Sequence, residues 1–163
     1  MLDVLTNLVL GYDEHIVPTM TISVVIVGMV VLAVLDVWRE IVEDYAIVVL
    51  LAVAVVGLDL EGIHPQQWLG AIVVSAIAFM IYLSLGHKGV LGGGDVKLSV
   101  VPAFVLGASV PFIGLWWIIC ALALQKGFAY VSSGGRKVSV AMPHVPAMAL
   151  ATLLASVAFP VAY

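Results

Sequence analysis

Long uncharged stretches alternate with short polar segments along almost the whole chain. A membrane-spanning helix needs roughly 20 apolar residues to cross about 30 Å of hydrocarbon. Three of the expected spans have that length, and the second along the chain is shorter, with 14 uncharged residues. The expected spans are Pro18 to Val37, Tyr45 to Leu58, Gln66 to Leu85 and His144 to Tyr163.

A further uncharged run, from Leu98 to Leu124, contains 27 residues, which is more than one span requires. It is either one tilted, kinked helix or two spans with a turn near Gly107-Ala108-Ser109. Two spans would place all six Lys and Arg residues on one side of the membrane. Cytoplasmic loops collect Lys and Arg. We therefore expect six spans, with both termini outside the cell and a plasma-membrane location.

The composition agrees with a membrane protein. Of the 163 residues, 64% are hydrophobic and 10% are charged, whereas soluble domains have roughly 45–50% apolar and about 25% charged residues. This excludes a soluble enzyme, a disordered chain and a disulfide-stapled domain. The net charge of −4 argues against a nucleic-acid partner. We expect one all-α transmembrane domain over residues 1–163 in the lipid bilayer, with residues 1–17 as a candidate interfacial segment.

Ionisable residues at membrane depth are costly and are candidates for function. Asp36 lies at the inner end of the first expected span. The C-terminal end of a helix carries partial negative charge and disfavours an acid. One interpretation is that Arg39, one turn later, neutralises Asp36. The other is that Asp36 is placed there for chemistry.

Asp95 begins the fourth expected span, directly after Gly92, Gly93 and Gly94. An acid at this place can simply cap free N–H groups of a helix. The glycines can form a flexible turn, adopt positive φ, or let an extended peptide lie close to the aspartate. They do not form a phosphate loop, since the Lys-Ser/Thr ending is missing and no strand precedes them.

Two expected spans separate Asp36 from Asp95, so both carboxylates reach the inner boundary of the membrane. Two neighbouring carboxylates share one proton, which is the arrangement of aspartic proteases. The ionised member activates a water molecule and the protonated member donates to the peptide carbonyl, without metal or cofactor. The histidines do not suggest a metal site, and we expect each to be solvated or locally bonded. They are His15, His64, His87 and His144.

The segment Gly92-Gly93-Gly94-Asp95-Val96-Lys97-Leu98 resembles the GxGDxKL motif of the type IV prepilin peptidases and archaeal preflagellin peptidases. These are integral-membrane aspartic proteases of the GxGD type. The resemblance implies that Asp36 and Asp95 are the catalytic pair. It also implies that Gly92 and Gly94 are the motif glycines and that Lys97 is the motif lysine. Pro143-His144-Val145-Pro146 is similar to a proline-containing segment of many members.

The chain departs from the family pattern after Asp36. Many members carry Ile-Pro-Asn or Val-Pro-Asp there, whereas the segment Arg39-Glu40-Ile41-Val42-Glu43-Asp44 has no proline. The paired Cys-x-x-Cys motifs of the larger bacterial enzymes are also missing, since Cys120 is the single cysteine. We therefore expect peptidase activity without methyltransferase activity.

The implied substrate is a membrane-anchored pilin-like or archaellin-like precursor, whose short basic leader is removed on the cytoplasmic side. Glu40, Glu43 and Asp44 are candidates to attract that leader, or they simply solvate a short loop. Three other functions stay open. They are a small transporter or channel, a presenilin-like protease, in which a Tyr-Asp pair would stand where Leu35-Asp36 stands, and a non-catalytic membrane subunit. The sequence does not indicate an oligomeric state.

Overall fold

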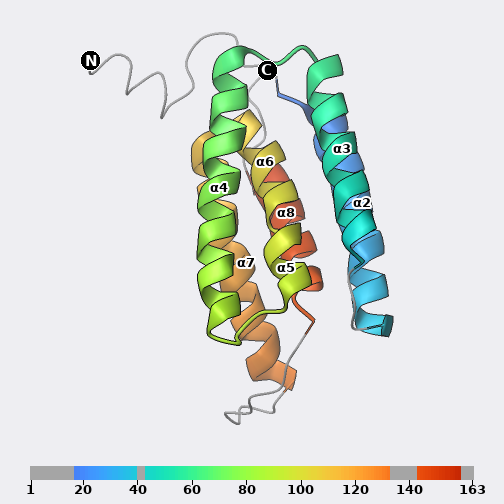
Figure 1. The fold of residues 1–163 in the computed structure, drawn as a ribbon, viewed down its shortest axis with the longest axis vertical. Coiled ribbons are helices and arrows are strands. Elements are labelled where there is room, and N and C mark those ends of the chain that lie inside the picture. Colours follow the sequence, from blue (N-terminus) through green and yellow to red (C-terminus); the bar gives the residue numbers. More distant parts are fainter. Residues whose placement is uncertain (1–16, 40–42, 133–142, 159–163) are drawn as a thin grey trace, which may run out of the picture.

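The computed structural model describes residues 17–39, 43–132 and 143–158. In these ranges every regular element is a helix (Figure 1). The expected interfacial segment at residues 1–17 lies almost entirely outside the described residues. The helices are α2 (Thr19–Arg39), α3 (Asp44–Leu60), α4 (Pro65–His87), α5 (Gly93–Leu98), α6 (Val100–Ser109), α7 (Pro111–Ser132) and α8 (Val145–Ala158).

The long run from Leu98 to Leu124 forms two helices that run in opposite directions (Figure 1). Helix α6 ends at Ser109, Val110 is extended with φ −145° and ψ 122°, and Pro111 begins α7. A residue before proline is driven out of the helical region, and proline is favoured in the first turn of a helix. The expected turn near Ser109 is therefore confirmed, and its cause is the Val110-Pro111 pair.

Successive helices of the bundle alternate in direction, with α5 and α6 together forming one traverse (Figure 1). Helix α6 lies in the centre, since all its residues from Val101 to Ser109 are buried. Helices α4 and α7 pack against it, and α2 packs against both α3 and α8. The ends of α2 and α4 and the start of α5 thus lie toward the same end of the bundle (Figure 1).

Small residues allow the central helices to approach closely. A Cβ atom built on Gly107 would lie 2.8 Å from the Cβ of Val74 and 2.9 Å from the carbonyl oxygen of Gly70. One built on Gly114 would lie 2.6 Å from Cγ1 of Val74. Glycine is common at such contacts in membranes, because close packing replaces the hydrophobic driving force that water supplies elsewhere.

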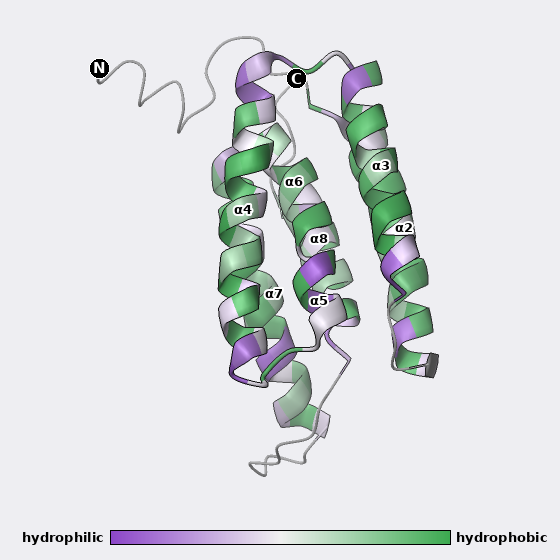
Figure 2. Ribbon diagram, viewed as in Figure 1, coloured by the Kyte–Doolittle hydropathy of each residue, from purple (hydrophilic) through white to green (hydrophobic). Residues whose placement is uncertain are grey.

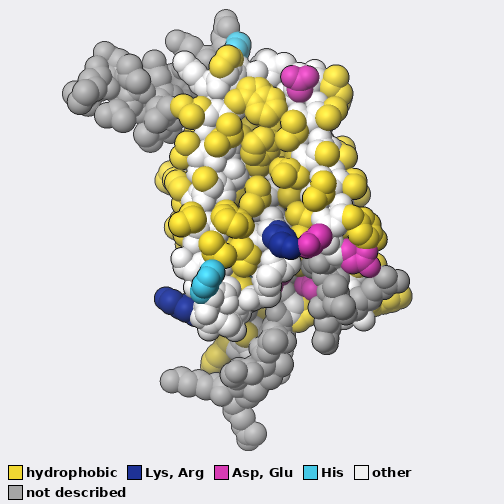
Figure 3. All heavy atoms as spheres, viewed as in Figure 1, with side chains coloured by type: hydrophobic (Ala, Val, Ile, Leu, Met, Phe, Trp, Pro, Cys, Tyr) yellow, Lys and Arg dark blue, Asp and Glu magenta, His cyan; other side chains and the backbone are white. Residues whose placement is uncertain are grey.

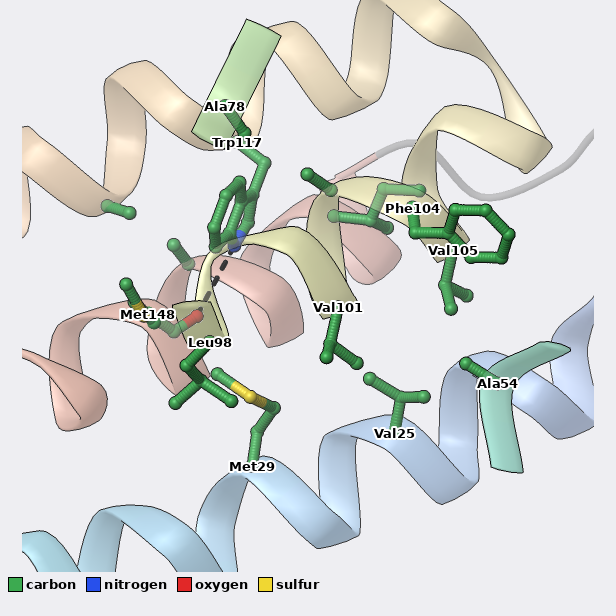
Figure 4. Close-up of a cluster of buried hydrophobic side chains, with 14 of the residues drawn as sticks. Val25, Met29, Ala54, Ala78, Leu98, Val101, Phe104, Val105, Trp117 and Met148 are labelled. Carbon is green, nitrogen blue, oxygen red and sulfur yellow. Dashed lines mark hydrogen bonds between the residues drawn. The ribbon is translucent and has the colours of Figure 1, made fainter. Parts of the chain in front are cut away.

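The interior of the described part is an apolar cluster to which each of its seven helices contributes. Val25, Met29, Leu98 and Val101 meet near its centre, beside Trp117 (Figure 4). The outside is also apolar: Figure 2 shows hydrophobic residues along the lengths of the helices, and on the face shown in Figure 3 hydrophobic side chains are many and charged side chains are few. A protein with apolar residues both inside and outside is a membrane protein.

Three of the described helices are long and apolar enough to cross a membrane. They comprise Thr19–Trp38 of α2, Pro65–His87 and Pro111–Ser132. Helix α8, with 14 residues, is a shorter apolar helix, and residues 159–163 of the expected last span lie outside the described part of the chain. The full number of spans and the sides of the termini remain predictions.

Candidate active site

Asp36 is buried inside the helix bundle. It lies in the last turn of α2, and its side chain is 6% exposed. Its Oδ2 atom accepts a hydrogen bond from the backbone N–H of Val145, at an N···O distance of 3.3 Å. Val145 is the first residue of α8, so the carboxylate of one helix lies at the N-terminus of another.

This contact offsets the cost that the sequence indicates for an acid at the end of α2. The free N–H groups at a helix N-terminus carry partial positive charge and stabilise an anion, by roughly 0.3–1 kcal/mol at exposed sites and up to about 2 kcal/mol where partly buried. The carboxylate of Asp36 therefore has a favourable partner in α8. The alternative partner, the side chain of Arg39, lies outside the described part of the structure.

Asp95 lies in the first turn of α5 and is half-buried. It is not the capping residue itself, because Gly92 occupies that position and Asp95 follows three residues later. The Asp95 Oδ2 atom accepts a hydrogen bond from the N–H of Gly92 at 3.1 Å. Asp95 thus does cap the helix, as one interpretation of the sequence predicts, but it does so from the third helical position rather than from the capping position. Its other carboxylate oxygen, Oδ1, takes no part in this hydrogen bond.

The glycines before Asp95 do not adopt the positive φ angles that favour glycine, and the feature that matters at Gly92 is the absence of a side chain. In the described part of the chain, the glycines with positive φ are Gly62 and Gly89, so Gly92 to Gly94 do not use that freedom. A Cβ built on Gly92 would lie 3.3 Å from Oδ2 of Asp95, whereas one on Gly93 would meet nothing within 4 Å. Gly92 thus leaves room for the Asp95 carboxyl group.

The fold brings the two aspartates into one region. The negative charge of Asp36 acts on the carboxyl group of Asp95, although the two residues come from α2 and α5. Neighbouring carboxyl groups disfavour the state in which both are ionised. A site with one ionised and one protonated carboxyl group can remove a proton from water and donate another to a carbonyl oxygen.

Lys97 and Asp44 form an ion pair on the surface beside this region, with a distance of 2.6 Å between Nζ and Oδ2. The pair joins α5 to the start of α3, and its side chains are 54% and 67% exposed. Exposed pairs contribute roughly 0–1 kcal/mol. Of the acidic residues expected to attract a basic leader, Asp44 is thus already paired with Lys97. Glu43 is exposed, and Glu40 lies outside the described residues.

The sequence did not predict that two polar residues, Tyr82 and His144, are buried together in the bundle. His144 is fully buried, and its Nε2 atom lies 3.0 Å from the hydroxyl of Tyr82, a residue of α4. The expectation that His144 is solvated or locally bonded is therefore wrong. The hydroxyl of Tyr82 also lies within range of the negative charge of Asp95. The available signal was a single tyrosine in the apolar stretch of α4 and a histidine directly before α8.

The other described histidines behave as expected. His87 is exposed, and its Nδ1 lies 2.9 Å from the carbonyl oxygen of Leu83 on the same helix. His64 is exposed and precedes α4. Among the residues that the structure describes, no group of three or more His, Cys, Asp or Glu side chains could hold a metal ion.

Comparison with known protein families gives one match. The sequence profile of the type IV leader peptidase family matches residues 23–125, a range that contains both Asp36 and Asp95. No curated protein matches the chain. No solved structure matches it either.

Proposed function

Since the chain belongs to the type IV leader peptidase family, we propose that it is a membrane aspartic endopeptidase whose catalytic pair is Asp36 and Asp95. The family makes the chain a peptidase of the membrane. The aspartic mechanism rests on one observation above all. Asp36 is buried at the end of α2, and this end lies at the same end of the bundle as the start of α5, which carries Asp95.

The proposed reaction needs only the two carboxyl groups and water. The ionised carboxylate takes a proton from a water molecule as the water oxygen attacks the carbonyl carbon of the scissile peptide bond. The protonated carboxyl group donates its proton to the carbonyl oxygen, giving a neutral tetrahedral intermediate. When this intermediate collapses, the C–N bond breaks, the leaving nitrogen receives the proton of the protonated carboxyl group, and a hydroxyl group of the intermediate gives its proton to the carboxylate as the C=O bond reforms. The pair then holds one proton again.

The proposed substrate is a pilin-like or archaellin-like precursor with a short basic leader and an apolar segment in the bilayer. An apolar hollow of about 450 Å³ between α2 and α8 supports this substrate. Val37 and Trp38 line it, and they directly follow Asp36; Pro146 also lines it, and it directly follows Val145. An apolar substrate helix in this hollow would lie alongside the residues next to the aspartates. Its basic leader would then meet the inner-face acids such as Glu43.

The test is cleavage by the purified chain in liposomes. The probe is a synthetic precursor with a short Lys- and Arg-rich leader followed by an apolar helix of roughly 20 residues. Mass spectrometry should show one cut, between the leader and the apolar helix. A matched probe with a neutral leader should be cut more slowly, because it loses the attraction of the inner-face acids. A chain that stays folded and leaves both probes intact would contradict the proposed function.

A further inference from the structure

His144 and Tyr82 form a buried polar contact inside the helix bundle. Both side chains are fully buried. Their rings lie 5.4 Å apart between centroids, and the His144 Nε2 atom is 3.0 Å from the Tyr82 hydroxyl. The Tyr82 ring also stacks on Trp117 of α7, with 6.3 Å between centroids and an interplanar angle of 11°. This contact therefore joins α4, α7 and the start of α8.

If its only role is packing, this contact lowers the stability of the fold relative to an apolar pair. The second ring nitrogen of His144, Nδ1, has no hydrogen-bond partner among the described residues. A buried polar atom without a partner costs roughly 1–3 kcal/mol. Apolar side chains of similar shape at both positions would avoid that cost. The energetics thus favour a role for the pair beyond filling the interior.

Both members of the pair are linked to the aspartates, each by a different route. His144 directly precedes Val145, whose N–H donates the hydrogen bond to Asp36. Tyr82 lies within range of the negative charge of Asp95. The bond between His144 and Tyr82 thus lies one residue before the N–H group that binds Asp36. His144 itself lies outside the range that the family profile matches.

We propose that the hydrogen bond between His144 and Tyr82 positions the aspartate pair, by fixing the Val145 N–H that binds Asp36. Both residues act through others and are positioning residues. The inference rests on the proposed function for its effect on catalysis. Its effect on the position of Val145 does not depend on any activity.

The decisive variant is Tyr82→Phe, which removes the hydroxyl and keeps the ring that stacks on Trp117. The control is Thr152→Val, which removes another buried hydrogen bond between helices, from Nε1 of Trp117 to Oγ1 of Thr152 at 2.9 Å. Both variants lose a buried bond of comparable length, so general destabilisation should affect both. The inference predicts that only Tyr82→Phe weakens the hydrogen bond between the Val145 N–H and Asp36.

The first measurement is hydrogen exchange of the Val145 amide, followed by NMR in protein labelled with ¹⁵N-valine. Tyr82→Phe should exchange this amide at least about tenfold faster than the unmodified protein, because the N–H leaves the Asp36 carboxylate more often. Thr152→Val should leave its protection close to that of the unmodified protein. Equal protection in all three proteins would overturn the inference, whether or not the protein cleaves any precursor.

The second measurement is steady-state cleavage of the basic precursor at matched amounts of folded protein. Tyr82→Phe and His144→Phe should each lower kcat roughly tenfold or more with little change in KM, since a small misplacement of reacting groups has such effects. The double variant should be no worse than either single variant. His144→Gln, whose amide reaches the place of Nε2, should restore much of the activity. An unchanged kcat, or an equal loss in Thr152→Val, would overturn the inference, whereas an unmodified protein that cleaves nothing would contradict the proposed function alone.

Discussion

The carboxylate of Asp36 and the backbone amide of Val145 are joined by a hydrogen bond of 3.3 Å, although 109 positions separate them in the chain. This bond connects the end of α2 to the beginning of α8, which lie side by side in the bundle. It places a buried acid in the favourable field of a helix N-terminus. The acid is thereby held near Asp95, which comes from a third helix.

The space around Asp95 gives a first prediction. In Gly92→Ala the new Cβ would lie 3.3 Å from Oδ2 of Asp95, so the carboxyl group has to shift by a few tenths of an ångström. We expect kcat for the basic precursor to fall roughly tenfold, because catalysis is sensitive to such displacements. Gly93→Ala is the matched control, since its Cβ meets nothing within 4 Å. Equal activity of the two variants would contradict the positional role of Gly92.

The close approach of α4, α6 and α7 gives a prediction about stability. Gly107→Ala places a Cβ 2.8 Å from the Cβ of Val74, and neither backbone can move away easily. We expect a loss of about 1–3 kcal/mol in the free energy of unfolding, the usual cost of overpacking. Gly127→Ala on α7 meets nothing within 4 Å and should be neutral or slightly stabilising. Unfolding titrations in detergent micelles measure both; equal stability of the two variants would show that the helices are not packed this closely.

The arrangement of the helix ends gives a prediction about topology. With Cys120 replaced by Ser, single cysteines are introduced at Lys88, at Asp59 and at Gly134, the last of which lies outside the described residues. A membrane-impermeant maleimide should label positions 88 and 134 only from the cytoplasmic side and position 59 only from outside. Labelling of position 134 from outside would mean an odd number of spans between positions 88 and 134.

Hydrophobic pattern alone located most of the helices. The first and third expected spans agree with α2 and α4 to within a few residues, because uninterrupted apolar runs bounded by charges have few alternatives in a membrane. The pattern did not reveal that the fourth traverse is divided at Ser99 into α5 and α6. Nor did it reveal that α6 is buried on all sides, since lipid-facing and interior residues are equally apolar.

The candidate site was only partly readable from the sequence. Asp36 and Asp95 stand out because charged residues are rare at membrane depth. The Val145 amide could not be predicted as a partner of Asp36, because tertiary packing brings it there across 109 positions, whereas the Gly92 amide lies only three residues before Asp95. The sequence made Asp44 a candidate to attract a leader peptide, but in the structure it is paired with Lys97, 53 positions later.

The central claim is that Asp36 and Asp95 act together as the catalytic pair, and their replacement by asparagine tests it most directly. Asn keeps an oxygen that can accept the N–H of Val145 or of Gly92, so the bundle should remain folded. The matched control is Asp59→Asn, which changes an exposed acid near the far end of α3.

The measurement is cleavage of the basic precursor in liposomes, with equal amounts of folded protein. Asp36→Asn and Asp95→Asn should each lower kcat by at least about 100-fold. The double variant should be little worse, because the two carboxyl groups act as a unit. Asp59→Asn should retain full activity. Substantial cleavage by Asp36→Asn would remove Asp36 from the pair, and substantial cleavage by Asp95→Asn would contradict the aspartic mechanism itself.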